Sequence, residues 1–307
     1  MSVQWSALRI SPCNLCPREC QAERKNGRTG FCLMDDKIVV ARAALHMWEE
    51  PCISGQSGSG TVFFSGCSLR CIYCQNNEIA AGKRGKQVSV SRLAEIFLEL
   101  QEKGAANINL VTPDHYVTSA AEAVMTARKM GLFLPIVYNG SGYEKREAIR
   151  NLSGIVDIYL TDFKYMDSGL AAKYSAAPDY PAVAKAALAE MVGSVGPPVF
   201  DENGMMKKGV IVRHLLLPGH KKNARDVIRY VYETYGDSVY LSLMNQYTPP
   251  AGLKGNPDYE GISRKVTKRE YDAVTDYAIG LGIRNAFIQE GDTAKESFIP
   301  AFDGEGV

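Results

Sequence analysis

Three cysteines stand close together directly after a short apolar segment of the chain. The sequence Cys67-Ser-Leu-Arg-Cys71-Ile-Tyr-Cys74 follows the run Thr61-Val-Phe-Phe64. Because an iron–sulfur cube normally takes one thiolate for each iron, three thiols on one loop can hold a [4Fe–4S] cluster and leave one iron without a protein ligand. The loop therefore predicts a metal centre with one open position, where chemistry can take place.

Two other interpretations of this loop compete with the cluster. Clustered cysteines can form half of a zinc site, which takes its remaining ligands from Cys or His further along. After Cys74 the chain has no cysteine, and its only histidines are His115, His214 and His220. The thiols could also pair as disulfides, but the start MSVQWSALRI has no basic segment followed by an apolar run, as a secretory signal would. The cluster is favoured over both.

A second cysteine set precedes this loop. Cys13, Cys16, Cys20 and Cys32 follow the spacing C-x2-C-x3-C-x11-C. Four thiols can close a tetrahedral zinc site or saturate an iron–sulfur cluster, and the spacing alone does not choose between them. Either site would have no open position, so its role would be structural or electron-relaying. The remaining Cys52 is expected to be a small buried apolar residue.

Composition places the chain among soluble globular proteins. Its 307 residues are 46% apolar and 22% charged, which predicts a sizeable core. The net charge of +1, from 35 basic and 34 acidic residues, gives no excess of positive charge for binding nucleic acid or an anionic membrane. No apolar stretch is long enough to span a bilayer. The cysteines form local sets, whereas the disulfides of a secreted protein would link distant segments. We therefore expect the protein in a reducing, anaerobic cytoplasm.

From residue 61 onward, short apolar or β-branched runs alternate with helical patterns. The expected strands are residues 61–64, 107–111, 134–138, 156–160, 210–217 and 239–243. One helical face is predicted by apolar side chains at helical spacing, Leu93, Ile96, Phe97 and Leu100. Three glycines are expected to end helices, namely Gly104, Gly131 and Gly236. Thr267 and Glu270 predict a capping box that opens the last helix.

Six strand–helix units predict an α/β fold, a partial (β/α)6 TIM-like barrel in which right-handed crossovers curl a parallel sheet. We expect a Cys-rich N-terminal module in residues 1–60 and the barrel domain in residues 61–307, with residues 54–60 as a flexible joint. Residues 193–209 interrupt the pattern with no assigned purpose. Ligands of such folds bind at the carboxyl ends of the strands, so the cysteine loop is expected at that rim.

Polar and aromatic residues lie at the other expected strand ends. Tyr73 precedes Cys74, where its ring could lie against a flat purine with its hydroxyl in solvent, or could simply cover the cluster. Asp114 follows the second strand and could supply a carboxylate. Asn139 ends the third, where it offers a donor and an acceptor beside Gly140, although a plain turn explains it nearly as well.

The fourth and fifth strands carry charged residues. Asp162 and Lys164 fall on one side of an extended segment and would face the barrel mouth. Such a pair suits a zwitterionic ligand, or it is an ordinary surface ion pair. Arg213 and His214 must point to opposite faces. Arg213 is the candidate for contact with a carboxylate or a substrate, unless it only covers the side of the barrel.

The pattern C-x3-C-x2-C, with an aromatic before the last cysteine, resembles the cluster loop of the radical S-adenosylmethionine (SAM) enzymes. This resemblance implies a [4Fe–4S] cluster whose open iron is chelated by the amine and carboxylate of SAM. It also implies that one electron cleaves SAM to methionine and a 5′-deoxyadenosyl radical. Tyr73 then stands where the family touches adenine, and Asp114 where Gly-Gly-Glu usually receives the SAM ammonium, although the glycines are absent here.

A finer resemblance covers residues 61–250. Cys71-Ile-Tyr-Cys74-Gln-Asn, Asp162-x-Lys164 and Arg213 before Pro218-Gly219 are similar to the pyruvate formate-lyase activating enzymes, a group of radical SAM oxidoreductases. In that group Asp-x-Lys contacts SAM. Tyr165 departs from the pattern, since those enzymes often have histidine there, and the Cys13–Cys32 set departs from the simplest members.

Three hypotheses for function follow. In the first, the chain takes a hydrogen from the α-carbon of glycine in a partner protein, with a flavodoxin- or ferredoxin-type protein as electron donor. In the second, SAM cleavage serves to modify a small molecule or another protein side chain, aided by an auxiliary cluster at Cys13–Cys32. In the third, both cysteine sets hold zinc in a binding protein without radical chemistry.

Overall fold

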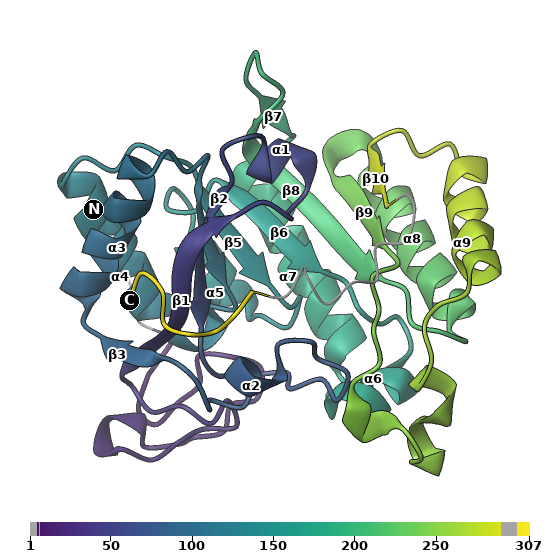
Figure 1. The fold of residues 1–307 in the computed structure, drawn as a ribbon, viewed down its shortest axis with the longest axis horizontal. Helices are drawn as coiled ribbons and strands as arrows, with labels where there is room; N and C mark the ends of the chain where they lie inside the picture. The colour runs from purple at the N-terminus through teal and green to yellow at the C-terminus, as the bar shows by residue number, and fades with distance from the viewer. Residues whose placement is uncertain (1–4, 6, 290–299) are drawn as a thin grey trace.

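One mostly parallel sheet forms the centre of the molecule (Figure 1). This computed structural model describes residues 5, 7–289 and 300–307. The strands are β1 (Ile38–His46), β2 (Ser59–Phe64), β3 (Lys86–Val88), β4 (Ile108–Val111), β5 (Ile136–Gly140), β6 (Ile158–Asp162), β7 (Val199–Phe200), β8 (Met206–Leu215), β9 (Tyr240–Met244) and β10 (Ala286–Ile288). The helices are α1 (Pro51–Ser54), α2 (Asn77–Ala80), α3 (Val90–Glu102), α4 (Val117–Lys129), α5 (Arg146–Asn151), α6 (Ser168–Ser175), α7 (Tyr180–Val195), α8 (Lys221–Tyr235) and α9 (Lys268–Gly280).

The six predicted strands pair in parallel in the order β2, β4, β5, β6, β8 and β9. The predicted α/β class is therefore confirmed, and the mostly parallel sheet is consistent with a partial barrel. Strand β10 adds a further parallel strand beside β9, while β1 and β3 add an antiparallel edge beside β2. The sheet stays open along this path, with β10 at one end and β3 at the other.

The helices pack in pairs, α3 on α4, α5 on α7 and α8 on α9 (Figure 1). They bury apolar side chains against the sheet. All four predicted apolar residues of α3 are buried, Leu93, Ile96, Phe97 and Leu100. Gly104, Gly131 and Gly236 follow helix ends with positive φ, as predicted. The capping box of α9 is present, because Thr267 and Glu270 each accept a hydrogen bond from the other's backbone N–H.

One expectation about a connecting segment is wrong, and a second segment gains a description. Residues 54–60 do not form a flexible joint, because Ser54 ends α1 while Ser59 and Gly60 are buried in β2. The Ser59 hydroxyl donates to the side-chain oxygen of Asn107 at 2.6 Å, and this contact joins the segment to the residue just before β4. Residues 193–209 contain the end of α7, strand β7 and the start of β8, and β7 folds back antiparallel on β8 as a hairpin.

Segments far apart in sequence meet at β1. This strand belongs to the proposed module of residues 1–60, yet it pairs with β2 of the barrel domain, and the domain division itself stays a prediction. Residues 304 and 305 run along β1, where the Ala43 N–H donates to the Glu305 carbonyl at 2.9 Å. Arg42 forms ion pairs with Asp303 and Glu305. Among the described residues, no helix is both long and apolar enough to cross a membrane.

Candidate functional site

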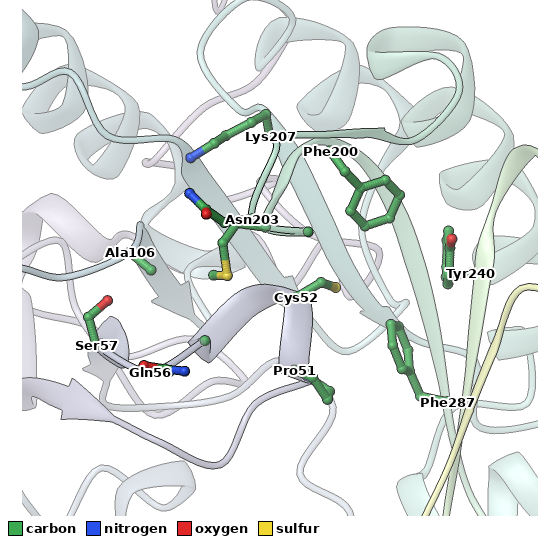
Figure 2. A pocket seen from close by; sticks show the side chains of 13 residues that line it. Pro51, Cys52, Gln56, Ser57, Ala106, Phe200, Asn203, Lys207, Tyr240 and Phe287 are labelled. Carbon is green, nitrogen blue, oxygen red and sulfur yellow. The ribbon is translucent and has the colours of Figure 1, made fainter.

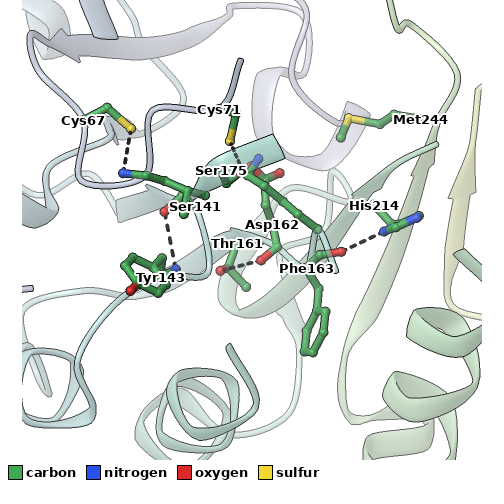
Figure 3. A network of polar contacts seen from close by, with 12 residues as sticks. Cys67, Cys71, Ser141, Tyr143, Thr161, Asp162, Phe163, Ser175, His214 and Met244 are labelled. Carbon is green, nitrogen blue, oxygen red and sulfur yellow. Dashed lines mark hydrogen bonds and ion pairs between the residues drawn. The ribbon is translucent and has the colours of Figure 1, made fainter. Parts of the chain in front are cut away.

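The cysteine loop leaves the carboxyl end of β2 and leads into α2. The Cys67 sulfur accepts hydrogen bonds from the backbone N–H groups of Leu69 and Arg70, each at 3.4 Å. The Ser175 hydroxyl donates to the Cys71 sulfur at 3.0 Å (Figure 3). None of the chain's cysteines forms a disulfide. The loop therefore presents free sulfurs supported by hydrogen-bond donors.

Electrostatics show that the three thiols of this loop are neighbours. Burial raises the pKa of the Cys67 thiol, and negative charge on Asp114, Cys71 and Cys74 raises it further. Burial likewise raises the pKa of Cys74 to about 11, Cys71 adds to this effect, and the Lys164 ammonium opposes it. Because thiolates are the metal-binding form, such a site needs a compensating positive centre to hold them charged.

Tyr73 is enclosed next to the loop. Its side chain is buried, its ring packs edge-on against Tyr174 and Tyr247, and its hydroxyl lies 2.7 Å from that of Tyr165. The expectation that this hydroxyl lies in solvent is therefore wrong. The hydroxyl of Tyr165, which stands where the activating enzymes often have histidine, also lies 2.8 Å from the Ser175 hydroxyl. The predicted contact of Tyr73 with adenine stays a prediction.

Asp162 and Lys164 form an ion pair at the carboxyl end of β6. Burial works against the charged ammonium, yet the Asp162 carboxylate and the nearby thiols raise the pKa of Lys164 above its usual value. Asp162 and Lys164 act electrostatically on Cys74 as well. The structure thus brings together the cysteine loop and the Asp-x-Lys segment, as the sequence predicted, and their role in binding SAM stays a prediction.

Two buried carboxyl groups lie on the neighbouring strand ends. Asp114 follows β4, and although burial opposes its charge, its contact with His115 lowers the pKa of the carboxyl. Glu144 follows β5, and burial, together with the charge of Asp114, raises its pKa to about 8. One carboxyl oxygen of each, Oδ2 of Asp114 and Oε2 of Glu144, has no hydrogen-bond partner. Orphaned buried oxygens of this kind suit a ligand that donates hydrogen bonds.

Sequence patterns do not point to Glu144, because Ser141-Gly-Tyr-Glu144 looks like an ordinary turn. Its Oε1 accepts a hydrogen bond from the Ser141 N–H at 2.9 Å. A Cβ at Gly140 would lie 2.6 Å from this oxygen, so the glycine makes room for Glu144. The expected close approach at Gly140 is real, but the group that approaches belongs to the chain itself.

Arg213 meets carboxylates of its own chain. It is paired with Glu49 and with Glu50, whose Oε1 lies 2.8 Å from the Arg213 Nε. Burial opposes the charge, but the two glutamates raise the pKa of Arg213. Asn109 donates to Glu49 at 3.0 Å, and Asn139 approaches the same oxygen at 3.5 Å. These contacts place Arg213 and Asn139 in one buried polar network, and their roles as ligand contacts stay predictions.

His214 lies on the opposite face of β8, as predicted. Its Nδ1 lies 2.7 Å from the Phe163 carbonyl oxygen, and burial lowers its pKa to about 4. The ring is therefore a neutral, buried partner of the neighbouring strand.

The N-terminal cysteines also gather in one place. Cys13, Cys16 and Cys32 are buried and interact electrostatically, while Cys20 is exposed. A Cβ at Gly30 would lie 3.0 Å from the Cys20 sulfur and 3.6 Å from the Cys32 sulfur, so both thiols lie beside this glycine. Within residues 5, 7–289 and 300–307, no three His, Cys, Asp or Glu side chains converge closely enough to hold a single metal ion.

A buried guanidinium supports this second set. Arg24 is 1% exposed, donates to the His115 carbonyl at 2.7 Å and contacts the Cys13 sulfur at 3.8 Å. Burial raises the pKa of Cys32 to about 11, and the positive charge of Arg24 opposes this rise. A fixed cation beside clustered thiols favours their thiolate forms.

A separate cavity of about 770 Å³ lies at the amino ends of the strands (Figure 2). It opens between α1 and the β7–β8 hairpin, and its lining includes Cys52, Phe200, Tyr240 and Phe287. Tyr240 is the first residue of β9, whereas the cysteine loop follows the last residue of β2. The cavity therefore lies away from the predicted site, and the buried Cys52 belongs to an apolar cluster, as expected.

The residues around Cys67 fit a [4Fe–4S] cluster with bound SAM. One loop supplies three thiols, one fewer than the irons of such a cluster. The orphaned Oδ2 of Asp114 can accept a hydrogen bond from an ammonium group. The Asp162–Lys164 pair offers both charges that a zwitterion needs.

Comparisons with known proteins agree with this chemistry. Residues 61–189 match the family model of the radical SAM superfamily. An uncharacterized protein of Methanocaldococcus jannaschii is 26% identical over 275 residues, which are 87% of this chain and 74% of that protein. The family model supports the radical SAM superfamily and does not support the narrower activating-enzyme group.

A solved structure shares the fold. A radical SAM methyltransferase from Sphaerobacter thermophilus has a TM-score of 0.51 at 15% identity, over 75% of this chain and 66% of that one. SuiB from Streptococcus suis has a TM-score of 0.49 at 15% identity, and this chain spans about half of it, 48%. At this identity the likeness to the methyltransferase shows the fold alone. Residues 61–189, with the three-thiol loop among them, therefore match the radical SAM superfamily.

Proposed function

We propose that the chain binds a [4Fe–4S] cluster through Cys67, Cys71 and Cys74 and cleaves SAM reductively beside it. The observation that carries this proposal is the loop of three free thiols at the carboxyl end of β2, within the matched domain. When bound, the cluster would supply the electron that converts SAM to methionine and a 5′-deoxyadenosyl radical. The chain's own residues bind and orient SAM and exclude water.

The acidic and basic residues at the strand ends can each contact a different group of SAM. Asp162 and Lys164 can meet its ammonium and carboxylate, because their opposite charges lie together beside Cys74. The free oxygen of Asp114 can accept a second hydrogen bond from the ammonium. The ring of Tyr73 next to Cys74 can cover the purine. Asn139 and Arg213 line the deeper polar network.

For the substrate, we propose the α-carbon hydrogen of a glycine in a partner protein. The Asp162-x-Lys164 and Arg213 resemblance to activating enzymes supports this proposal. Glycine suits the reaction because it has no side chain to obstruct a buried site. A flavodoxin- or ferredoxin-type protein would supply the electron. The alternative, modification of a small molecule or another side chain, is an outcome of the test below.

We further propose that Cys13, Cys16, Cys20 and Cys32 hold a second iron–sulfur cluster. Zinc needs four ligands around one ion, but no three metal-binding side chains converge to that extent in the described part of the chain. A cluster takes each thiolate on a different iron, so its ligands stand further apart. The Cys20 and Cys32 sulfurs both lie beside Gly30, close enough to share one cluster.

Iron and sulfide analysis of anaerobically purified chain tests both sites. We expect about eight irons per chain, about four after Cys16→Ala, and unchanged iron after Cys52→Ala, a buried cysteine outside both sets. Zinc without iron or sulfide would refute the radical SAM proposal. About four irons in the unaltered chain would refute only the second cluster.

The substrate proposal needs candidate partner proteins. Incubation of the chain with SAM, a reductant and each candidate should give a doublet electron paramagnetic resonance (EPR) signal on one of them. SAM cleavage without such a signal on any candidate would favour the small-molecule or side-chain alternative.

A further inference from the structure

A buried hydroxyl lies against the thiol of Cys71. Ser175 is the last residue of α6 and is 1% exposed. Its Oγ lies 3.0 Å from the Cys71 sulfur and 2.8 Å from the Tyr165 hydroxyl. A thiolate can only accept, and each hydroxyl has one hydrogen to donate. With Cys71 bound as a thiolate, Ser175 must therefore donate to Cys71.

Arg18 of the N-terminal cysteine set holds this serine in place. It lies between Cys16 and Cys20, and its guanidinium donates to the Ser175 carbonyl at 2.9 Å and to the Ala176 carbonyl. A cation at these carbonyls is favourable because they end α6, where the helix dipole is negative.

The same side chain reaches the cysteine loop itself. The Arg18 Nε donates to the Ser68 carbonyl at 2.9 Å, and its guanidinium stacks 4.0 Å from the centre of the Phe31 ring. One guanidinium thus joins three segments: the Cys16–Cys20 turn, the loop that contains Cys71, and the end of α6. A planar fork with several donors is suited to such a clamp, whereas a lysine could not contact these carbonyls together.

We propose that Ser175 tunes the reduction potential of the cluster at Cys71 through its hydrogen bond to the sulfur, and that Arg18 is the positioning residue that keeps Ser175 there. The inference rests on the proposed function, because it requires a cluster on Cys67, Cys71 and Cys74. Reduction adds negative charge to the cluster, and a hydrogen bond donated to a ligand sulfur stabilises that charge. The bond therefore raises the potential. The N-terminal cysteine segment acts on the SAM-binding centre through this contact.

An EPR-monitored potentiometric titration of the anaerobically reconstituted full chain tests the role of Ser175. Ser175→Ala should lower the potential, changing the ratio of reduced to oxidised cluster at a fixed potential about tenfold, or about 59 mV for one electron. Ser175→Thr keeps the hydroxyl and should restore the original value. Ser194→Ala, at a half-buried serine of α7, should leave it unchanged. An unchanged potential in Ser175→Ala with full cluster content would overturn the inference.

A double variant tests the clamp. Arg18→Met should shift the potential in the same direction as Ser175→Ala, and the two changes together should shift it no further than Ser175→Ala alone. If Arg18→Met does not fold, Arg18→Lys should give a smaller shift with the same sign. Fully additive shifts, or the original potential in a folded Arg18 variant, would overturn the role of Arg18. Absence of any iron–sulfur cluster from the unaltered chain would refute the proposed function itself.

Discussion

Replacement of Arg213 by methionine would leave two buried carboxylates without their cation. The side chain of Arg213 is 13% exposed, and those of Glu49 and Glu50 are 7% and 6% exposed. Removing one partner of a buried ion pair costs about 3 to 5 kcal/mol, because the remaining charge stays desolvated. Asn109 still donates to Glu49 in the variant, which compensates only one oxygen. We therefore expect Arg213→Met to lower the free energy of unfolding by about 3 kcal/mol or more.

Urea denaturation of the metal-free chain, followed by circular dichroism, measures this loss. Lys268→Met is the matched control, because Lys268 and its partner Asp272 are 88% and 45% exposed. Surface pairs contribute about 0 to 1 kcal/mol, so this control should change stability little. Adding Glu49→Gln and Glu50→Gln to Arg213→Met should restore part of the loss, since no buried charge then remains unpaired. A loss below about 1 kcal/mol in Arg213→Met would contradict the inferred burial cost.

Three more predictions concern single residues. The pKa of Glu144 is raised to about 8 from an ordinary 4.5, so between these pH values the folded chain keeps a proton that the unfolded chain has released. The free energy of unfolding should therefore fall as pH rises through this range, by up to roughly 1.4 kcal/mol per pH unit. Glu144→Gln should remove that slope in urea titrations, and an unchanged slope would disprove the assignment. Gly142→Ala should destabilise the chain far more than Gly154→Ala. A Cβ at residue 142 would lie 2.1 Å from the Asp162 carbonyl oxygen, whereas the space at Gly154 is open. Equal midpoints of thermal unfolding for the two variants would contradict this prediction. Cys16→Ala should retain the EPR signal of the SAM-binding cluster, and its loss would show that the two cysteine sets do not load independently.

Local patterns in the sequence were enough to predict the central strands. Runs such as residues 107–111 and 156–160 are apolar and bounded by helical segments, so β4 and β6 were predicted to within about two residues. Strand β10 has only three residues, and β1 is antiparallel and lies among the N-terminal cysteines, so neither fitted the repeating unit. The prediction of a flexible joint at residues 54–60 fails because glycine and serine also occur in a buried strand that approaches its neighbour closely.

The candidate site was predictable where its residues are close in sequence. Cys67, Cys71 and Cys74 are on one loop, and Asp162 and Lys164 are two residues apart, so spacing alone grouped them. Partners contributed by distant segments could not be predicted in this way. Arg213 meets Glu49 and Glu50 across more than 160 positions of the chain, and Ser175 reaches Cys71 from the end of a helix. Such pairings depend on how the elements pack, which a spacing pattern does not record.

Release of 5′-deoxyadenosine tests the central claim most directly. The anaerobically reconstituted chain is incubated with SAM and dithionite, and the nucleoside is quantified by chromatography. We expect release from the unaltered chain and from Cys52→Ala, and none from Cys71→Ala. Release by Cys71→Ala, or none from an unaltered chain that carries its full iron and sulfide, would contradict a SAM-cleaving cluster on this loop.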